Sequence, residues 1–486
     1  MQYYSTNHQA PMADLRKAVV KGLAEDRGLY MPERINPLPK AFFDNMPSMK
    51  FQDIAYTVAD AFFGEDIDGD SLHDLVYDTL QFDCPVVRVK DNIYALELFH
   101  GPTLAFKDVG ARFMARLLRH FLAVSPSSPE KDTIEAPSGA VGGASVNVLV
   151  ATSGDTGSAV ANGFLGVDGI HVYVLYPKGK VSPIQECQFT TLGRNVTAIE
   201  VDGVFDDCQR LVKSAFTDDD LNRHMRLTSA NSINVARFLP QAFYYFNAVA
   251  RLMSVECRTE NVELATAMPS APDGTAVANS TLYTLHSTLK ICVPSGNFGN
   301  ICSALIGHAM GLPVKRFIAA NNANDVFYNY LQTGHYQPKP SKQTLANAMD
   351  VGDPSNFARI IDFYSQSGKL SPEETHRRIT ALISGATYTD DQIRQTMRQC
   401  YYETGYILDP HGACGYRALQ EQLQPGEVGV FCETAHPAKF KEKVDEILGI
   451  DIHIPERLAA FMRGTKQSIP MTRHFDDFKR FLMTRA

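Results

Sequence analysis

Short apolar runs alternate with amphipathic segments along most of the chain. The runs are rich in β-branched residues, are followed by glycine turns, and cover residues 146–151, 171–176, 195–201, 289–293 and 316–320. Strand followed by helix, repeated, is typical of parallel sheets with helices on their faces. In such sheets ligands bind in the loops at the carboxyl ends of the strands. The pattern therefore predicts an α/β protein whose chemistry lies in these loops.

Local signals predict one helix start, two irregular stretches and a separate N-terminal unit. Ser182, Pro183 and Gln185 supply in order an N-cap, a first-turn proline and a capping-box glutamine, so a helix is predicted to begin there. Residues 125–145 and 266–288 are rich in Ser, Ala, Gly, Pro and Thr without periodicity, which predicts two surface insertions. The first ninety or so residues carry mixed signals and are predicted to form a separate accessory unit.

Composition narrows the class of protein. With 486 residues the chain should hold two or three domains, and 44% hydrophobic and 21% charged residues are ordinary for a globular protein. No stretch has the apolar length of a membrane span, and the first residues lack a basic segment followed by an apolar run. We therefore expect a cytoplasmic protein without a membrane anchor.

Charge and cysteine usage exclude further classes. The formal net charge is −8 and no Lys/Arg block stands out, so we expect small-molecule ligands and no nucleic-acid partner. The nine cysteines are scattered, and no two have the C-x-x-C spacing of a zinc site. They are predicted to be reduced thiols, and no metal is expected.

Lys107 is the first candidate for chemistry. It follows a turn and an apolar triplet, and after it Val109, Phe113, Leu117 and Phe121 recur every four positions. Lys107 is therefore predicted to open a helix, where the helix dipole and partial burial both favour loss of its proton. A neutral amine can form a Schiff base. The alternative for Lys107 alone is a solvated cation or a partner of Asp108.

Two glycine loops each follow a predicted strand and open a predicted helix. Backbone N–H groups in both loops can surround an anion, a carboxylate or phosphate in the first and a monophosphate in the second, although either can be a simple turn. Neither loop matches a dinucleotide or nucleoside triphosphate fingerprint. The candidate residues of the first loop are Ser153, Asp155, Thr156 and Gly157, and those of the second are Gly296, Asn297, Phe298, Gly299 and Asn300.

Two polar clusters complete the candidates. One contains Asn231, Ser232, Asn234 and Arg237, and the planar guanidinium of Arg237 suits a dianionic phosphate. The other contains Thr434, whose hydroxyl can form a neutral hydrogen bond with a ring nitrogen. Taken alone, each cluster also fits ordinary loop or surface chemistry.

In this order the segments resemble the long bacterial and fungal form of the threonine synthase family. The resemblance runs from residues 22–30 (GLAEDRGLY) through residues 97–108 (ELFHGPTLAFKD) to Lys439, Phe440 and Lys441, and the two insertions depart from it. It implies the fold type II architecture of pyridoxal phosphate enzymes. That architecture has two parallel-sheet α/β domains, here with an N-terminal accessory domain. The expected division is 1–92 for the accessory domain, 93–120 and 236–450 for the large cofactor-binding domain, 121–235 for the small domain, and 451–486 for a C-terminal helical segment.

The resemblance also implies residue roles. Lys107 would form the Schiff base with pyridoxal 5'-phosphate and shuttle protons. Gly296, Asn297, Phe298, Gly299 and Asn300 would hold the cofactor phosphate, and Thr434 would meet the pyridine nitrogen. The loop with Ser153, Asp155, Thr156 and Gly157 would receive the substrate. Asn231, Ser232, Asn234 and Arg237 would hold the substrate phosphate.

The implied reaction is a lyase reaction of amino-acid biosynthesis. O-phospho-L-homoserine and water would give L-threonine and phosphate. The main alternative is a phospho-lyase that forms 2-oxobutyrate, ammonia and phosphate from the same substrate. A catalytically silent binding protein and a nicotinamide oxidoreductase are weaker alternatives, because the lysine and phosphate loop are intact and the dinucleotide fingerprint is absent.

Overall fold

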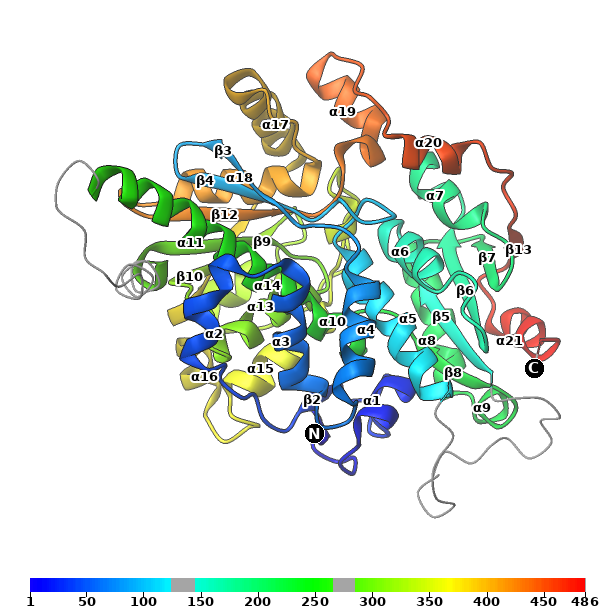
Figure 1. Cartoon of the computed structure of the whole chain (residues 1–486). Coiled ribbons are helices and arrows are strands. Elements are labelled where there is room, and N and C mark those ends of the chain that lie inside the picture. Colours follow the sequence, from blue (N-terminus) through cyan, green and yellow to red (C-terminus); the bar gives the residue numbers. More distant parts are fainter. Residues whose placement is uncertain (124–144, 265–284, 486) are drawn as a thin grey trace.

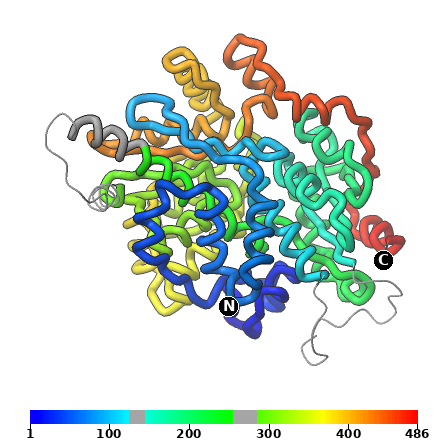
Figure 2. The backbone as a smooth tube through the Cα atoms, viewed as in Figure 1, coloured from blue at the N-terminus to red at the C-terminus, as the bar shows by residue number. Residues whose placement is uncertain are grey.

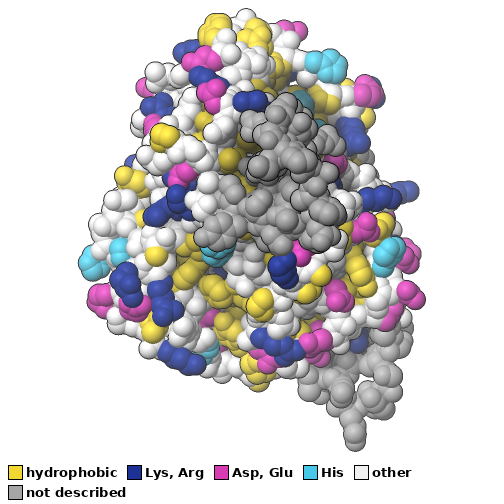
Figure 3. Space-filling model, turned by 60° about the vertical axis from the view of Figure 1, so that its left-hand side comes forward, with side chains coloured by type: hydrophobic (Ala, Val, Ile, Leu, Met, Phe, Trp, Pro, Cys, Tyr) yellow, Lys and Arg dark blue, Asp and Glu magenta, His cyan; other side chains and the backbone are white. Residues whose placement is uncertain are grey.

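Two α/β units and an N-terminal unit build the molecule, in a computed structural model that describes residues 1–123, 145–264 and 285–485 (Figure 1). Apart from their last residues, the two predicted insertions lie outside these ranges. On the face shown in Figure 3, Lys/Arg and Asp/Glu side chains are interspersed rather than separated by sign. Among the described helices, none combines the length and the apolar character that a membrane crossing requires.

The smaller sheet has five parallel strands in the order β13-β7-β6-β5-β8. Its strands are β5 (Val146–Ala151), β6 (Ile170–Pro177), β7 (Val196–Val201), β8 (Arg226–Ser229) and β13 (Ile469–Met471). Its helices are α6 (Asp155–Gly163), α7 (Pro183–Thr190), α8 (Phe205–Thr217), α9 (Asp219–His224) and α21 (Phe475–Met483). Successive side chains of β5 point to opposite faces, so Val150 shares a core with Val160 of α6, whereas Leu149 shares one with Leu211 of α8.

The larger sheet has six strands in the order β11-β10-β9-β12-β4-β3, of which only β3 runs antiparallel to its neighbour. The strands are β3 (Val86–Lys90), β4 (Ile93–Glu97), β9 (Leu289–Pro294), β10 (Arg316–Asn321), β11 (Ile383–Thr387) and β12 (Val428–Glu433). Ile291 of β9 belongs to the core on one face, and its neighbour Cys292 belongs to the core on the other.

Helices cover both faces of this sheet. The helices that share the core of Ile291 include α5 (Lys107–Ala123), α10 (Val235–Phe238), η2 (Leu239–Gln241), α11 (Ala242–Leu264), α13 (Gly299–Ala309), α14 (Val326–Thr333), α15 (Phe357–Tyr364) and α16 (Pro372–Leu382). Those that share the core of Cys292 include η3 (Asn347–Met349), α17 (Asp390–Thr404), α18 (Pro410–Gln422), η4 (Pro437–Phe440) and α19 (Lys441–Leu448).

The N-terminal unit packs on the larger unit rather than forming a core of its own. It contains β1 (Tyr3–Ser5), α1 (Leu15–Lys21), β2 (Tyr30–Pro32), α2 (Lys40–Asn45), η1 (Met46–Ser48), α3 (Phe51–Phe63) and α4 (Gly69–Thr79). Helix α3 lies against α11, and the rings of Phe63 and Phe113 approach to 5.1 Å between centroids. The buried residues of the N-terminal unit therefore belong to the same core as Ile291.

The predicted strands and the helix start at Pro183 are confirmed. Two features differ from the predicted division of the chain. The boundary at residue 92 separates β3 from β4, although the two strands pair. The segment after residue 450 is not only helical: α20 (Glu456–Met462) contacts α7, and β13 then extends the smaller sheet (Figure 2). The C-terminal segment thus crosses from the larger unit to the smaller one.

Candidate active site

A cavity of about 100 Å³ lies between the two sheets, at the carboxyl ends of their strands. It is lined by the start of α5 and by the loops that follow β5, β8, β9 and β12. The predicted site residues that line it are Lys107, Ser153, Thr156, Asn231, Ser232, Arg237, Gly296, Asn297, Phe298, Gly299, Asn300 and Thr434. The fold thus brings together residues from five segments that are far apart in the sequence.

Lys107 is the first residue of α5, as predicted, and it lines the cavity. Burial is the main reason that the pKa of its amine is lowered to about 8; the carboxylate of Asp155 opposes this shift, and the cations of Lys439 and Arg237 add to it. Asp108 does not pair with Lys107. Its carboxylate instead accepts hydrogen bonds from the N–H of Thr103 at 2.8 Å and from the hydroxyl of Thr103 at 2.6 Å. Lys107 is therefore available to a ligand in a partly deprotonated form near neutral pH.

The loop between β9 and α13 opens toward the cavity. Within the described ranges, no acceptor pairs with the backbone N–H groups of Gly296, Asn297, Phe298 or Gly299. Phe298 caps α13 in the left-handed conformation, with φ of 63°, which directs successive N–H groups to one side. A Cβ on Gly299 would lie 2.7 Å from Cβ of Ser232, so this close approach requires glycine. The loop can thus surround an anion such as a phosphate, and we call residues 296–300 the phosphate cradle.

A network that the sequence did not reveal holds this cradle. Asn356 donates from Nδ2 to the carbonyl of Asn297 at 2.7 Å and to Oγ of Ser232 at 3.1 Å. Arg359, 1% exposed, donates to Asn356 Oδ1 and to the carbonyls of Tyr30, Ser232 and Ile233. The available signal was an arginine beside the apolar residues of α15. Arg359 therefore joins the N-terminal unit to the cradle.

In the loop between β5 and α6, several polar groups bind other groups of the protein and do not face the cavity. Oγ1 of Thr152 accepts hydrogen bonds from the N–H groups of Gly154 at 2.9 Å and Gly157 at 2.8 Å. Asp155 is buried against Lys439 and does not line the cavity, and neither does Gly157. Ser153 and Thr156 remain at the surface of the cavity. Of this loop, therefore, two of the four predicted residues line the cavity.

The segment after β8 contributes Asn231, Ser232 and Arg237 but not Asn234. Asn234 caps α10 through the N–H of Ala236 and donates to the carbonyl of Val19 at 2.8 Å, so its polar atoms are used within the protein. Arg237 is 2% exposed, and burial lowers the pKa of its guanidinium to about 10. Among the described residues its Nε–H has no hydrogen-bond partner, so the side chain retains a donor for an anion.

Several buried polar residues behind Thr434 were not predicted. The N–H of Ala348 donates to Nε2 of His411 at 3.1 Å, and the other ring nitrogen of His411 lies 2.6 Å from Asp409. His411 is therefore neutral, with its proton on Nδ1. Burial and the adjacent Asp409 raise the pKa of Glu433 well above its ordinary value. Through its hydrogen bond with the N–H of Ala348, His411 holds η3 against the phosphate cradle.

These features fit one cofactor. A lysine with a lowered pKa, a loop of unpaired N–H groups and a hydroxyl at Thr434 match the aldehyde, phosphate and ring nitrogen of pyridoxal phosphate. Fold and site together therefore define a pyridoxal-phosphate-dependent enzyme of fold type II. The chain matches the family described as "Pyridoxal-phosphate dependent enzyme" over residues 81–433. It also matches "Threonine synthase N terminus" over residues 2–80 and "Threonine synthase, C-terminal" over residues 412–482.

Whole-chain relatives identify the family. Threonine synthase from Escherichia coli strain K12 is 40% identical over 461 residues, 94% of each chain. A crystal structure of threonine synthase from Escherichia coli has a TM-score of 0.83 and 37% identity over 100% of both chains. A structure of PLP-bound threonine synthase from Brucella melitensis has a TM-score of 0.83 and 31% identity over 100% of this chain and 99% of that one. The chain belongs to the threonine synthase family of pyridoxal-phosphate-dependent lyases, which confirms the predicted resemblance, fold class, cofactor and function.

Proposed function

We propose that the cavity converts O-phospho-L-homoserine and water to L-threonine and phosphate. The observation that carries the proposal is the presence of two separate anion sites around one lysine. The phosphate cradle of residues 296–300 is one, and Arg237 with its unpaired donor is the other. A phosphorylated cofactor and a phosphorylated substrate require two such sites.

The residues 296–300 would hold the cofactor phosphate, Thr434 would meet the pyridine nitrogen and Lys107 would hold the aldehyde carbon. When bound, pyridoxal phosphate withdraws electrons from the substrate carbon skeleton and so acidifies its C–H bonds. The hydroxyl of Thr434, unlike a carboxylate, would leave the ring nitrogen uncharged and so would moderate that withdrawal.

Lys107 would act as the base. With a pKa of about 8, an appreciable fraction of its amine is neutral near pH 7, so it can take the proton from the substrate α-carbon and exchange protons at the neighbouring carbons. Ser153 and Thr156 would orient the substrate carboxylate through their hydroxyls and through the start of α6.

Arg237, with Asn231 and Ser232, would bind the substrate phosphate. A pKa of about 10 keeps Arg237 cationic at neutral pH, and its burial strengthens the attraction to a departing phosphate. We assign Asp155, Gly157 and Asn234 indirect roles, because their polar atoms or packing serve other residues.

Product analysis tests the proposal. Purified enzyme loaded with cofactor is incubated with O-phospho-L-homoserine, and threonine, 2-oxobutyrate and phosphate are quantified together. Threonine and phosphate should form in equal amounts, and Lys107→Ala should abolish both. If 2-oxobutyrate and ammonia dominate, the phospho-lyase alternative replaces this proposal.

We also propose a cytoplasmic enzyme without a nucleic-acid partner. The net charge of −8 and the interspersed surface charges support this proposal. The division into an accessory, a large and a small domain is retained, with the first boundary moved before β3 and with β13 assigned to the small domain.

A further inference from the structure

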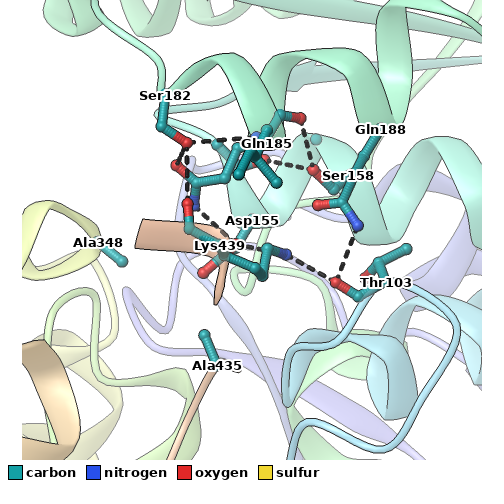
Figure 4. Close-up of polar contacts among 12 residues, drawn as sticks. Thr103, Asp155, Ser158, Ser182, Gln185, Gln188, Ala348, Ala435 and Lys439 are labelled. Atoms are coloured by element: carbon teal, nitrogen blue, oxygen red, sulfur yellow. Dashed lines mark hydrogen bonds and ion pairs between the residues drawn. The ribbon is translucent and has the colours of Figure 1, made fainter. Parts of the chain in front are cut away.

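Lys439 and Asp155 form a buried ion pair where the two sheets meet (Figure 4). Lys439 Nζ lies 2.7 Å from Asp155 Oδ1, and the side chains are 0% and 3% exposed. Lys439 belongs to η4, which follows β12 of the larger sheet, and Asp155 is the first residue of α6 on the smaller sheet. The pair therefore joins the two units immediately outside the cavity.

Hydrogen bonds fix the geometry of both partners. Lys439 Nζ donates to the carbonyl of Thr103 at 2.7 Å, and Gln185 Nε2 donates to Asp155 Oδ1 at 2.8 Å. Gln188 Nε2 donates to the same carbonyl of Thr103 at 3.0 Å. The side chain of Gln185 thus serves Asp155 instead of completing the capping box of α7 predicted from the sequence.

The ion pair is also connected to the start of α5. Thr103, whose carbonyl binds Lys439, donates two hydrogen bonds to Asp108, the residue after Lys107. A buried ion pair is weak evidence for stability, because removing two charges from water offsets much of their attraction. Its position beside the reactive lysine indicates another role.

The charges that act on Lys107 come from three elements. Asp155 of α6 favours a proton on Lys107, whereas Lys439 of η4 and Arg237 of α10 oppose it. Asp350 and His411 also line the cavity. Without Lys439, the buried carboxylate of Asp155 would lose its ion-pair partner, and Lys107 is the other cation whose charge acts on it.

We infer that Lys439 is a positioning residue that occupies the carboxylate of Asp155 and so prevents Asp155 from holding a proton on Lys107. The inference rests on the proposed role of Lys107 as the base. It explains why Asp155 is buried beside the cavity without lining it. It also ties the reactivity of Lys107 to the docking of the two sheets, because each sheet supplies one partner of the pair.

Two single variants of the holoenzyme test the inference, because they should shift the same midpoint in opposite directions. The midpoint is the pH at which half of the Lys107 nitrogen is protonated. Lys439→Met should raise this midpoint by about one pH unit, and Asp155→Asn should lower it by a similar amount. Both are measured in the pH profile of kcat/KM and in the pH titration of the visible absorbance of the resting holoenzyme. The sign is the same whether the Lys107 nitrogen is a free amine or is bonded to the cofactor, since both forms can carry a positive charge.

Lys290→Met is the matched control. Lys290 forms another buried pair, 2.6 Å from Glu427, with side chains 9% and 6% exposed, and it also donates to a backbone carbonyl, that of Gln422, at 2.7 Å. It lies at the beginning of β9, at the opposite end of the strand from the phosphate cradle. Its loss should lower the thermal midpoint of unfolding and leave both pH midpoints unchanged.

Unchanged midpoints in Lys439→Met, or shifts of the same sign in both variants, would overturn the inference. Lys439→Arg retains the positive charge and should keep the midpoint within a few tenths of a unit of wild type. If Lys439→Met does not fold, Asp155→Asn still tests the direction of the midpoint shift. Lys439→Arg still tests whether a positive charge at position 439 is enough to keep the wild-type midpoint. The absorbance titration needs no substrate, so it tests the inference even if the wild-type enzyme forms no threonine. Failure of the inference can therefore be distinguished from failure of the proposed function.

Discussion

The two glycine loops look alike in sequence but serve different purposes in the structure. Among the described residues, no acceptor pairs with the N–H groups of Gly296 to Gly299 in the loop after β9, and every residue from Gly296 to Asn300 lines the cavity. The loop after β5 instead uses Thr152 to bind two of its own N–H groups and buries Asp155 against Lys439. One loop is therefore a cradle for an anion, whereas the other is a rigid turn that presents two side chains.

This difference shows that a loop that binds a ligand through backbone N–H groups is stabilised differently from a loop that binds a ligand through side chains. A phosphate held by N–H groups requires close approach, which explains the two glycines and the tight contacts of Gly296 with η3 and of Gly299 with Ser232. A substrate positioned by Ser153 and Thr156 requires a fixed backbone, which Thr152 supplies.

The largest effect is expected from Gly296→Ala. A Cβ at this position would lie 2.5 Å from the carbonyl oxygen of Ala348, which is backbone and cannot rotate away. The affinity for pyridoxal phosphate should fall by roughly a hundredfold, about 3 kcal/mol, measured by absorbance titration of cofactor-free enzyme. Gly69→Ala, where the Cβ would meet only the flexible end of Tyr56 at 3.3 Å, is the control and should keep wild-type affinity.

Thr152→Val should separate substrate binding from cofactor binding. The change removes the acceptor of two buried N–H groups and loosens the first loop. KM for O-phospho-L-homoserine should rise about tenfold while the cofactor affinity stays unchanged, as steady-state kinetics at saturating cofactor would establish. Thr79→Val, which removes a buried helical hydroxyl far from the loop, should leave KM unaltered. An equal loss of cofactor affinity would contradict the separation.

Gly157→Ala should act on stability. Its Cβ would lie 2.5 Å from Cγ2 of Thr152 and 2.8 Å from Cγ1 of Val174, inside the core of the smaller unit. The free energy of unfolding should fall by about 1–3 kcal/mol in urea denaturation, with little change in cofactor affinity. If this variant weakened cofactor binding as much as Gly296→Ala, the two loops would not have separate purposes.

The smallest effect concerns the segment that covers the second loop. Asp350 accepts hydrogen bonds from Asn322 and Thr344, and burial raises its pKa from 3.8 to about 6. The folded state therefore binds this proton more tightly than the unfolded state, so the contribution of Asp350 to stability is full below pH 4 and is lost as the pH rises through 6. Asp350→Asn should flatten that part of the dependence of Tm on pH, measured by calorimetry between pH 4 and 7.

Local patterns predicted the parts of this protein that local physics decides. Short apolar runs rich in β-branched residues identified the strands, and the apolar stripe after Lys107 identified its helix, because both patterns are written into neighbouring positions. Parallel topology then implied that the loops would lie at the carboxyl ends of the strands, where ligands bind. Most of the predicted cavity-lining residues follow from these steps together with the resemblance to a family.

Tertiary structure alone decided how individual polar atoms are used. Asp155 and Asn234 are of residue types that often bind ligands. In the folded chain, however, Asp155 pairs with Lys439, and Asn234 donates to the carbonyl of Val19. Arg359 and His411 gave no motif, because their partners lie in distant segments.

By itself, the sequence determined the class of fold, the candidate lysine at the start of a helix and the loops that can surround anions. Only the folded chain determined which groups remain unpaired. The physical reason is that a pKa or a free hydrogen-bond donor depends on burial and on the few ångströms between residues brought together by folding, which periodicity and spacing do not encode. For the two glycine loops, that difference is what separates a phosphate cradle from a rigid turn.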